Sequence, residues 1–255
     1  GHIQGNPWLA GGEAKVIVNQ VNSSNPSHLN GYIEVGGRKA DVIIANTAGI
    51  NVDGGGFINA GGVTLITGNP LLNSGNVSGF QIRDGLINIT GQGLDTSTAD
   101  YTRLLSHAAQ INAGVWAKDL AVVTGKNDID AQNNISQAGT ASGGTNTTNN
   151  TPKFAIDTGS LGGMYAGKIS LISTEKGVGI NNAGQIFASV GSIKISADGQ
   201  LQNSGAVVAQ HKEDTNQATL AITATELNNS GSISSLAQQS FQTSSINNTG
   251  LIATS

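Results

Sequence analysis

The 255-residue chain has no cysteine, one methionine, four prolines and a charged fraction of only 11%. Without cysteine it forms no disulfide and no Cys-ligated zinc or iron–sulfur site. Disordered chains are usually rich in charge and proline, so the scarcity of both argues against disorder. The net charge of -4 and the lack of a basic run argue against nucleic acid or an anionic membrane as partner. No apolar run reaches the roughly 18–20 residues of a membrane-spanning helix.

Glycine and asparagine are abundant instead, with 36 and 27 residues. The glycines follow no every-third pattern, which excludes collagen. Strong helix formers are scarce, whereas threonine, serine, valine and isoleucine are common, and this balance favours strands over helices. The composition therefore predicts an all-β protein with many turns.

An apolar-x-Asn-x-Gly-x-apolar repeat occupies the C-terminal part of the chain. Its Asn-to-Asn separations are 21, 26 and 19 residues. A short alternating stretch such as Ile193-Lys194-Ile195 precedes each of the later copies, and weaker copies stand at Asn59–Val63 and Asn73–Val77. In the four clear copies, the asparagine and the glycine of the pattern are Asn182 and Gly184, Asn203 and Gly205, Asn229 and Gly231, and Asn248 and Gly250.

A period near 20 residues with strand-type alternation predicts one coil of a parallel β-helix per repeat. Glycine after asparagine suits a corner where φ is positive. Stacked coils would align the asparagine side chains, whose amides can hydrogen-bond from coil to coil. The alternative is a β-sandwich whose turns happen to be rich in asparagine and glycine.

One segment, 126–153, interrupts the repeat. It contains the polar tract Ala141–Asn150, which has no alternating apolar residues, and we expect a flexible insertion between coils of a single domain spanning 1–255. A domain linker is the alternative, but repeat-like sequence on both sides favours one continuous rod. The sequence of Thr98–Ala109 is compatible with either a helix or a strand.

The N-terminal third carries a series of motifs in a characteristic order. Asn6–Leu9 reads Asn-Pro-Trp-Leu, Asn25–Val35 follows, and Asn46–Ile50 precedes Gly56–Asn59. Gly91–Leu94, Asn112–Lys118 and Ser160–Ala166 continue the series. This order resembles the secretion domain of two-partner-secretion exoproteins, a family that includes filamentous haemagglutinin, large haemolysins and contact-dependent growth inhibition effectors.

The resemblance implies a right-handed parallel β-helix with an N-terminal cap and extra-helical strands or loops. It implies recognition, in the periplasm, by the POTRA domains of an outer-membrane TpsB-family transporter. The domain then starts export of a much longer adhesin or toxin-delivery exoprotein, which is secreted or held on the surface of a Gram-negative bacterium. On this interpretation the chain is a fragment of that exoprotein, a monomer, without a cofactor and without catalytic activity.

The resemblance also assigns residues to transporter recognition. The first family motif matches Asn6, Pro7, Trp8 and Leu9. The second usually reads Asn-Pro-Asn-Gly-Ile, and here Asn46, Gly49 and Ile50 match it. Thr47 replaces the proline, so a rigid turn is not expected there.

Two other functional classes compete with this interpretation. A polysaccharide-active β-helical enzyme needs clustered carboxylates, but the 16 acidic residues are scattered along the chain. The four histidines never stand at metal-ligand spacing, so no metal site is expected. An adhesin module would be favoured by exposed aromatic residues. We expect instead that Trp116 lies in the core and that Trp8 packs in the cap.

Deleting Thr140–Thr151 is expected to leave the melting temperature and secretion nearly unchanged. The tract has no apolar residue beyond Ala141, and changing the length of a flexible loop costs only ~0.6 kcal/mol per doubling. Thermal unfolding followed by circular dichroism, together with the amount of secreted product, checks this. A melting temperature lowered by about ten degrees or more would show that the segment packs on the rod.

Overall fold

The computed structural model describes residues 12–138 and 152–254. Strands dominate these ranges, and the one helical element in them is a 3-10 turn, η1 (Thr215–Gln217). The expected all-β class is therefore confirmed. In the same ranges, no helix has the length and apolar character needed to cross a membrane. Asn6–Leu9, and with it the expected cap residue Trp8, lies outside the described residues.

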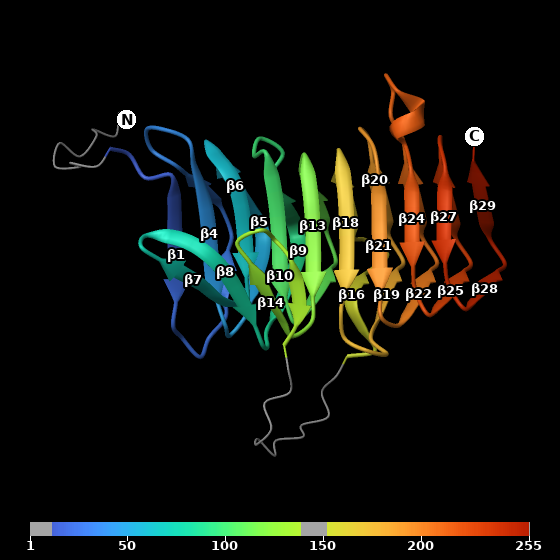
Figure 1. The fold of residues 1–255 in the computed structure, drawn as a ribbon. Helices are drawn as coiled ribbons and strands as arrows, with labels where there is room; N and C mark the ends of the chain where they lie inside the picture. Colours follow the sequence, from blue (N-terminus) through green and yellow to red (C-terminus); the bar gives the residue numbers. More distant parts are fainter. Residues whose placement is uncertain (1–11, 139–151, 255) are drawn as a thin grey trace, which may run out of the picture.

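A nine-stranded parallel sheet, called sheet A here, runs the length of the rod. Figure 1 shows its strands side by side from the N-terminal to the C-terminal end. Each pairs with the strand of the next coil in a parallel register, for example Ile193 opposite Leu220. In spatial order the strands are β1 (Val16–Val21), β4 (Ala40–Asn46), β6 (Ala60–Ile66), β10 (Tyr101–Ser106), β13 (Asp119–Thr124), β18 (Lys168–Ser173), β21 (Ile193–Ala197), β24 (Leu220–Thr223) and β27 (Gln239–Gln242).

A second parallel sheet, sheet B, contains two columns of strands. The long strands β5 (Ile50–Ile58) and β9 (Leu86–Asp95) span both columns. The first column contains β2 (Ser27–Leu29), β11 (Ala108–Ile111), β16 (Phe154–Thr158), β19 (Gly179–Asn182), β22 (Gln200–Asn203), β25 (Glu226–Asn229) and β28 (Ser245–Asn248). The second column contains β3 (Tyr32–Glu34), β12 (Gly114–Trp116), β17 (Gly163–Ala166), β20 (Gln185–Ala188), β23 (Ala206–Ala209), β26 (Ser232–Ser235) and β29 (Leu251–Thr254).

Each coil therefore crosses sheet A once and then both columns of sheet B. Nine strands in sheet A correspond to nine coils in the described part of the chain. This arrangement confirms the expected parallel β-helix. The stretch 98–109, for which helix and strand were both open, contains β10 and the start of β11.

The interior of the rod is a continuous apolar core. Alternate residues point inward: in β21, Ile193 and Ile195 are 1% exposed, while Lys194 between them faces solvent. Because successive side chains in a strand point to opposite faces, the alternating pattern of the sequence translates directly into this core. Each fully buried isoleucine or leucine contributes roughly 1.5–3 kcal/mol relative to an exposed one.

A four-stranded antiparallel sheet lies outside the rod, as the family resemblance implied. Its order is β15-β14-β8-β7, and Figure 1 shows β7, β8 and β14 lying across the N-terminal half of sheet A. The expected flexible insertion at 126–153 is therefore wrong for its first part, which forms two of these strands. Likewise, Asn73–Val77 is the hairpin between β7 and β8 and not a coil corner. The four strands are β7 (Gly68–Asn73), β8 (Asn76–Ile82), β14 (Asn127–Asp130) and β15 (Ile135–Gln137).

This extra-helical sheet buries the outer face of the N-terminal half of sheet A. A second apolar cluster forms between them, separate from the interior core. In β4 the inward Val42 and Ile44 and the outward Ile43 and Ala45 are all buried. The buried members of the second cluster are Ile43, Ala45, Ile66, Phe80, Ile82, Leu105, Val123 and Ile129.

At the four corners, glycine is needed because the backbones of successive coils come very close together there. The expectation that these glycines have a positive φ is wrong. None of Gly184, Gly205, Gly231 and Gly250 has a positive φ. A β-carbon at Gly205 would instead collide with the carbonyl oxygen of Gly184 in the preceding coil, and the same collision recurs from each of these glycines to the next. The absence of a side chain is what allows the corners to stack at strand spacing.

We expect Gly205→Ala to lower the free energy of unfolding by at least ~2 kcal/mol, because the added methyl group must displace the backbone of the neighbouring coil. Gly31→Ala is the matched control, since a β-carbon at Gly31 meets nothing within 4 Å, and its effect should stay within about 0.5 kcal/mol. Chemical denaturation of the two variants measures both values. Equal stability of the variants would contradict the close-approach explanation.

Candidate functional site

The second motif, Asn46–Ile50, forms the corner between β4 and β5. Asn46 Nδ2 donates to the carbonyl oxygen of Asn25 at 2.9 Å and to Ser27 Oγ at 2.9 Å. Asn46 Oδ1 accepts from the backbone N–H of Ala48 at 2.9 Å. Gly49 has a φ of 121°, a value that favours glycine, and its carbonyl accepts from Ser27 N at 3.0 Å. The corner therefore holds the Asn25–Ser27 segment of the first coil in place.

Most of this motif is inaccessible in the folded protein. Asn46 is 1% exposed and Ile50 is 0% exposed. Gly49 is also buried, and only Thr47 faces solvent freely. A partner of the folded domain would thus meet Thr47, whereas a partner of the unfolded chain would meet all five residues.

The C-terminal corners form a ladder of side-chain amides inside the rod. Asn182 Nδ2 donates to Asn203 Oδ1 at 2.8 Å, and Asn203 Nδ2 donates to Asn229 Oδ1 at 2.7 Å. Asn229 continues the ladder to Asn248 at 2.7 Å. Asn182, Asn203 and Asn229 are buried, and each also donates to the carbonyl oxygen of its own corner glycine. The amides hydrogen-bond one another from coil to coil where water has no access, which is a structural role, and Asn182 Oδ1 at the start of the ladder has no partner among the described residues.

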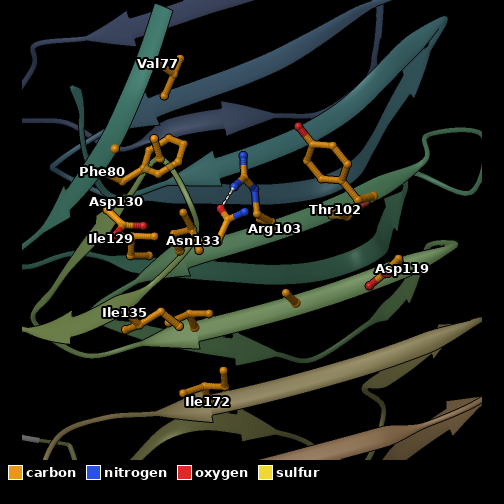
Figure 2. Close-up of a pocket in the computed structure, with 16 residues that line it drawn as sticks. Val77, Phe80, Thr102, Arg103, Asp119, Ile129, Asp130, Asn133, Ile135 and Ile172 are labelled. Carbon is orange, nitrogen blue, oxygen red and sulfur yellow. Dashed lines mark hydrogen bonds between the residues drawn. The ribbon is translucent and has the colours of Figure 1, made fainter. Parts of the chain in front are cut away.

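A groove lies between the extra-helical sheet and the outer face of sheet A (Figure 2). Its volume is about 510 Å3, and apolar side chains such as Val77, Ile135 and Ile172 line much of it. Figure 2 shows Arg103 directed toward Asn133, to which its Nη1 donates at 2.6 Å.

Arg103 is held from several directions. Its guanidinium lies 5.1 Å from the ring centroid of Phe80 and 5.0 Å from that of Tyr101, and its Nε donates to Thr64 Oγ1 at 3.2 Å. Such contacts with aromatic rings are worth about 0.5–2 kcal/mol each. Arg103 therefore joins the extra-helical sheet to the rod and is not a free binding group.

Three aspartates are held in their ionised form by neighbouring hydrogen bonds. The pKa values of Asp95, Asp130 and Asp214 lie below the usual range, and the largest cause is a hydrogen bond from a neighbouring side chain, which stabilises the ionised form. A glycosidase acid needs a raised pKa instead. The donors are Ser97, Asn134 and Gln217, respectively.

Within residues 12–138 and 152–254, no group of three or more His, Cys, Asp or Glu side chains is placed to hold a metal ion. His107 Nε2 lies 2.9 Å from Glu175 Oε2, and both side chains are mostly buried. This pair links the corner after β10 to the corner after β18, two coils further along.

Trp116 is not in the core, so that prediction is wrong. It is 42% exposed, and its ring stacks on Tyr165 with centroids 6.2 Å apart and an interplanar angle of 15°. Its apolar neighbours Val115 and Ala117 suggested burial, but strand alternation turns Val115 inward and Trp116 outward. Alternation counted from Val115 was the signal in the sequence that would have placed Trp116 correctly.

Comparison with known proteins decides the family. The model of the TPS secretion domain family matches residues 8–203. The chain belongs to this family. As a TPS secretion domain, it comes from a class of exoproteins that are secreted or displayed at the cell surface, and it implies a TpsB-type partner transporter.

Its relatives are far longer than the chain itself. Toxin CdiA from Yersinia pestis is 52% identical over 207 residues, which are 81% of this chain and 6% of that protein. The tRNA nuclease CdiA-2 from Burkholderia pseudomallei (strain 1026b) is 47% identical over 207 residues, 80% of this chain and 6% of that protein. The chain thus spans about 6% of the length of these curated relatives.

The crystal structure of the filamentous hemagglutinin secretion domain has the same fold. The two structures superpose with a TM-score of 0.65 at 24% sequence identity, over 94% of this chain and 75% of that one. At this identity the likeness supports the fold alone, a β-helix.

Phe80→Ala tests whether the extra-helical sheet is an integral part of the TPS domain. Phe80 is 2% exposed in the second apolar cluster, so we expect a loss of about 3 kcal/mol in the free energy of unfolding. Leu72→Ala on the same hairpin is the control, because Leu72 is 57% exposed. Denaturation curves and hydrogen exchange of residues 68–82 provide the measurement. A Phe80→Ala variant as stable as Leu72→Ala would show that the sheet is only loosely attached.

Proposed function

We propose that this TPS domain is recognised in the periplasm by the POTRA domains of its TpsB-type transporter and then starts the export of a much longer exoprotein. The observation that carries the proposal is the family match, which extends from residue 8 to the end of β22 in the seventh coil. The domain acts as a monomer and needs neither a cofactor nor nucleic acid. In this proposal it catalyses no reaction.

The architecture supports export driven by folding. In both columns of sheet B and in sheet A, a new strand pairs with the strand one coil earlier. A chain emerging from a pore can therefore bury apolar surface coil by coil, because the strands of each new coil pair with strands of the coil before it. Each completed coil is folded outside the transporter, and a folded coil cannot pass back through the pore.

Recognition in this scheme precedes folding. Asn46, Gly49 and Ile50 are buried in the finished rod, so a transporter reads them only in the unfolded chain. The dipeptide Asn6-Pro7 favours a turn by its sequence alone, because proline fixes φ and asparagine can hydrogen-bond its own backbone. We therefore assign the larger recognition role to Asn6, Pro7, Trp8 and Leu9, and a mainly structural role to the Asn46–Ile50 corner.

Asn6→Asp is expected to reduce secretion with little loss of stability, whereas Asn46→Asp should act through stability. The carboxylate introduced by Asn46→Asp would face the Asn25 carbonyl oxygen where an N–H now donates, and we expect a loss of ~3 kcal/mol. Asn22→Asp makes the same chemical change at an exposed position. The measurements are secreted product with the cognate transporter present and the melting temperature of each purified domain.

Two outcomes would overturn the assignment. Normal secretion of Asn6→Asp would remove Asn6 from transporter recognition. Reduced secretion of the Asn22→Asp control to the same extent would show that added negative charge, and not the motif, impairs export. Secretion of the unaltered domain without any TpsB transporter would refute the proposed function as a whole.

A further inference from the structure

A column of aromatic and acidic side chains follows the outer face of sheet B. Strand register aligns these positions across successive coils: Trp116 stands opposite Asp95 on one side and Tyr165 on the other. Each of the residues points away from the core, since the inward neighbours Leu94, Val115 and Met164 are 0% exposed. From the first coil to the sixth, the column contains Tyr32, Gly56, Asp95, Trp116, Tyr165 and Phe187.

Glycines make room for the rings against the sheet. A β-carbon at Gly56 would collide with the ring of Tyr32, and one at Gly114 would collide with the ring of Trp116. Gly163 provides the same space for Tyr165. The rings are thereby held in place on the surface, which lowers the entropy that a ligand must overcome when it binds them.

Polar groups adjoin the rings in a cleft of about 460 Å3 that Tyr32, Gln92, Asp95, Ser97 and Trp116 line together with Gly54 and Gly55. Ser97 holds Asp95 Oδ1 through its N–H and its hydroxyl, at 3.0 and 2.7 Å. Asp95 Oδ2 has only a long contact of 3.4 Å from the Tyr32 hydroxyl. The turn that carries Gln92 is fixed by a hydrogen bond from its N–H to Asp53 Oδ1 at 2.9 Å.

We propose that this column, formed by Tyr32, Asp95, Trp116, Tyr165 and Phe187, binds a neutral oligosaccharide that lies along the rod. The C–H face of a sugar ring packs on an aromatic ring, and its hydroxyl groups donate to a carboxylate and exchange hydrogen bonds with an amide. Aromatic surface with a few fixed polar groups, in a volume of roughly 300–1,000 Å3, is typical of small-ligand sites. Trp116, Tyr165 and Phe187 stand in three successive coils, and the first two ring centroids are 6.2 Å apart, so more than one sugar unit can be contacted along the rod.

Charge favours a neutral ligand over an anionic one. The second-column strands β3, β12, β17 and β20 contain no lysine or arginine. The hydrogen bond from Ser97 lowers the pKa of Asp95, which keeps this carboxylate ionised at neutral pH. A phosphate, an acidic sugar or an anionic lipid would meet this negative charge without a compensating cation. The site thus goes beyond export and concerns the folded rod after secretion.

The test is calorimetric titration of the purified chain with maltohexaose, cellohexaose and N-acetylchitohexaose, with a galacturonate hexamer as the acidic probe. We expect at least one neutral probe to bind with a Kd below about 10 mM. Trp116→Ala should raise that Kd at least about tenfold, because it removes the stacking surface. Leu72→Ala, which removes an exposed side chain from the opposite, extra-helical surface, should leave it unchanged.

Tyr32→Ala is a second variant, for the case that Trp116→Ala lowers the melting temperature of the domain. Tyr32 is 60% exposed, so its removal should weaken binding with little effect on stability. In a Trp8→Phe background, the fluorescence of Trp116 should change on addition of the neutral probe. The proposal is overturned if no neutral probe binds below about 10 mM, if the acidic probe binds as tightly, or if both alanine variants retain the Kd. Secretion of Trp116→Ala should be normal, which separates this site from the export function.

Discussion

The spacing between successive coils constrains the whole rod. Parallel strands stack at ~4.8 Å, and every group at a corner must fit within that distance. At the C-terminal corners two residues meet this condition: the glycine lets one backbone approach the carbonyl of the coil before it, and the asparagine connects the buried amides across the gap. A larger residue in place of Gly205, or a non-amide in place of Asn203, would push the coils apart or leave buried polar groups without partners.

The outer surface of the rod differs between its two halves for a related reason. In the N-terminal half, the extra-helical sheet covers sheet A and converts its outer face into a second core. In the C-terminal half no such cover is present in the described residues, and the outward positions of β21 and β24 are polar or small, as at Lys194 and Thr223. Within residues 12–138 and 152–254 no strand covers the outer face of sheet B, and the aromatic column lies there.

Much of this was predictable from local patterns, and the errors have physical causes. The repeat at Asn182, Asn203, Asn229 and Asn248 predicted the coils and their amide ladder because both depend on nearest neighbours. The apolar run Val42–Ala45 is buried on both faces of its strand, but nothing local in the sequence shows that residues 127–130 supply part of the cover. The apolar neighbours of Trp116 favour burial, whereas strand alternation turns its ring outward. The buried contacts of Asn46 with Asn25 and Ser27 join different coils, which a motif alone does not reveal.

The pairing of β8 with β14 has a consequence for how the rod comes apart. These strands belong to insertions in the third and the fifth coil, so their hydrogen bonds bypass the fourth coil. A stack linked only through adjacent coils can unwind one coil at a time from either end. Here the third coil cannot detach from the fourth while Ile82 and Asn127 remain paired, and Arg83 adds a contact to Asp128 at 2.7 Å. The third, fourth and fifth coils are therefore expected to unfold together, and a pulling force that reaches the third coil is resisted by all three of them.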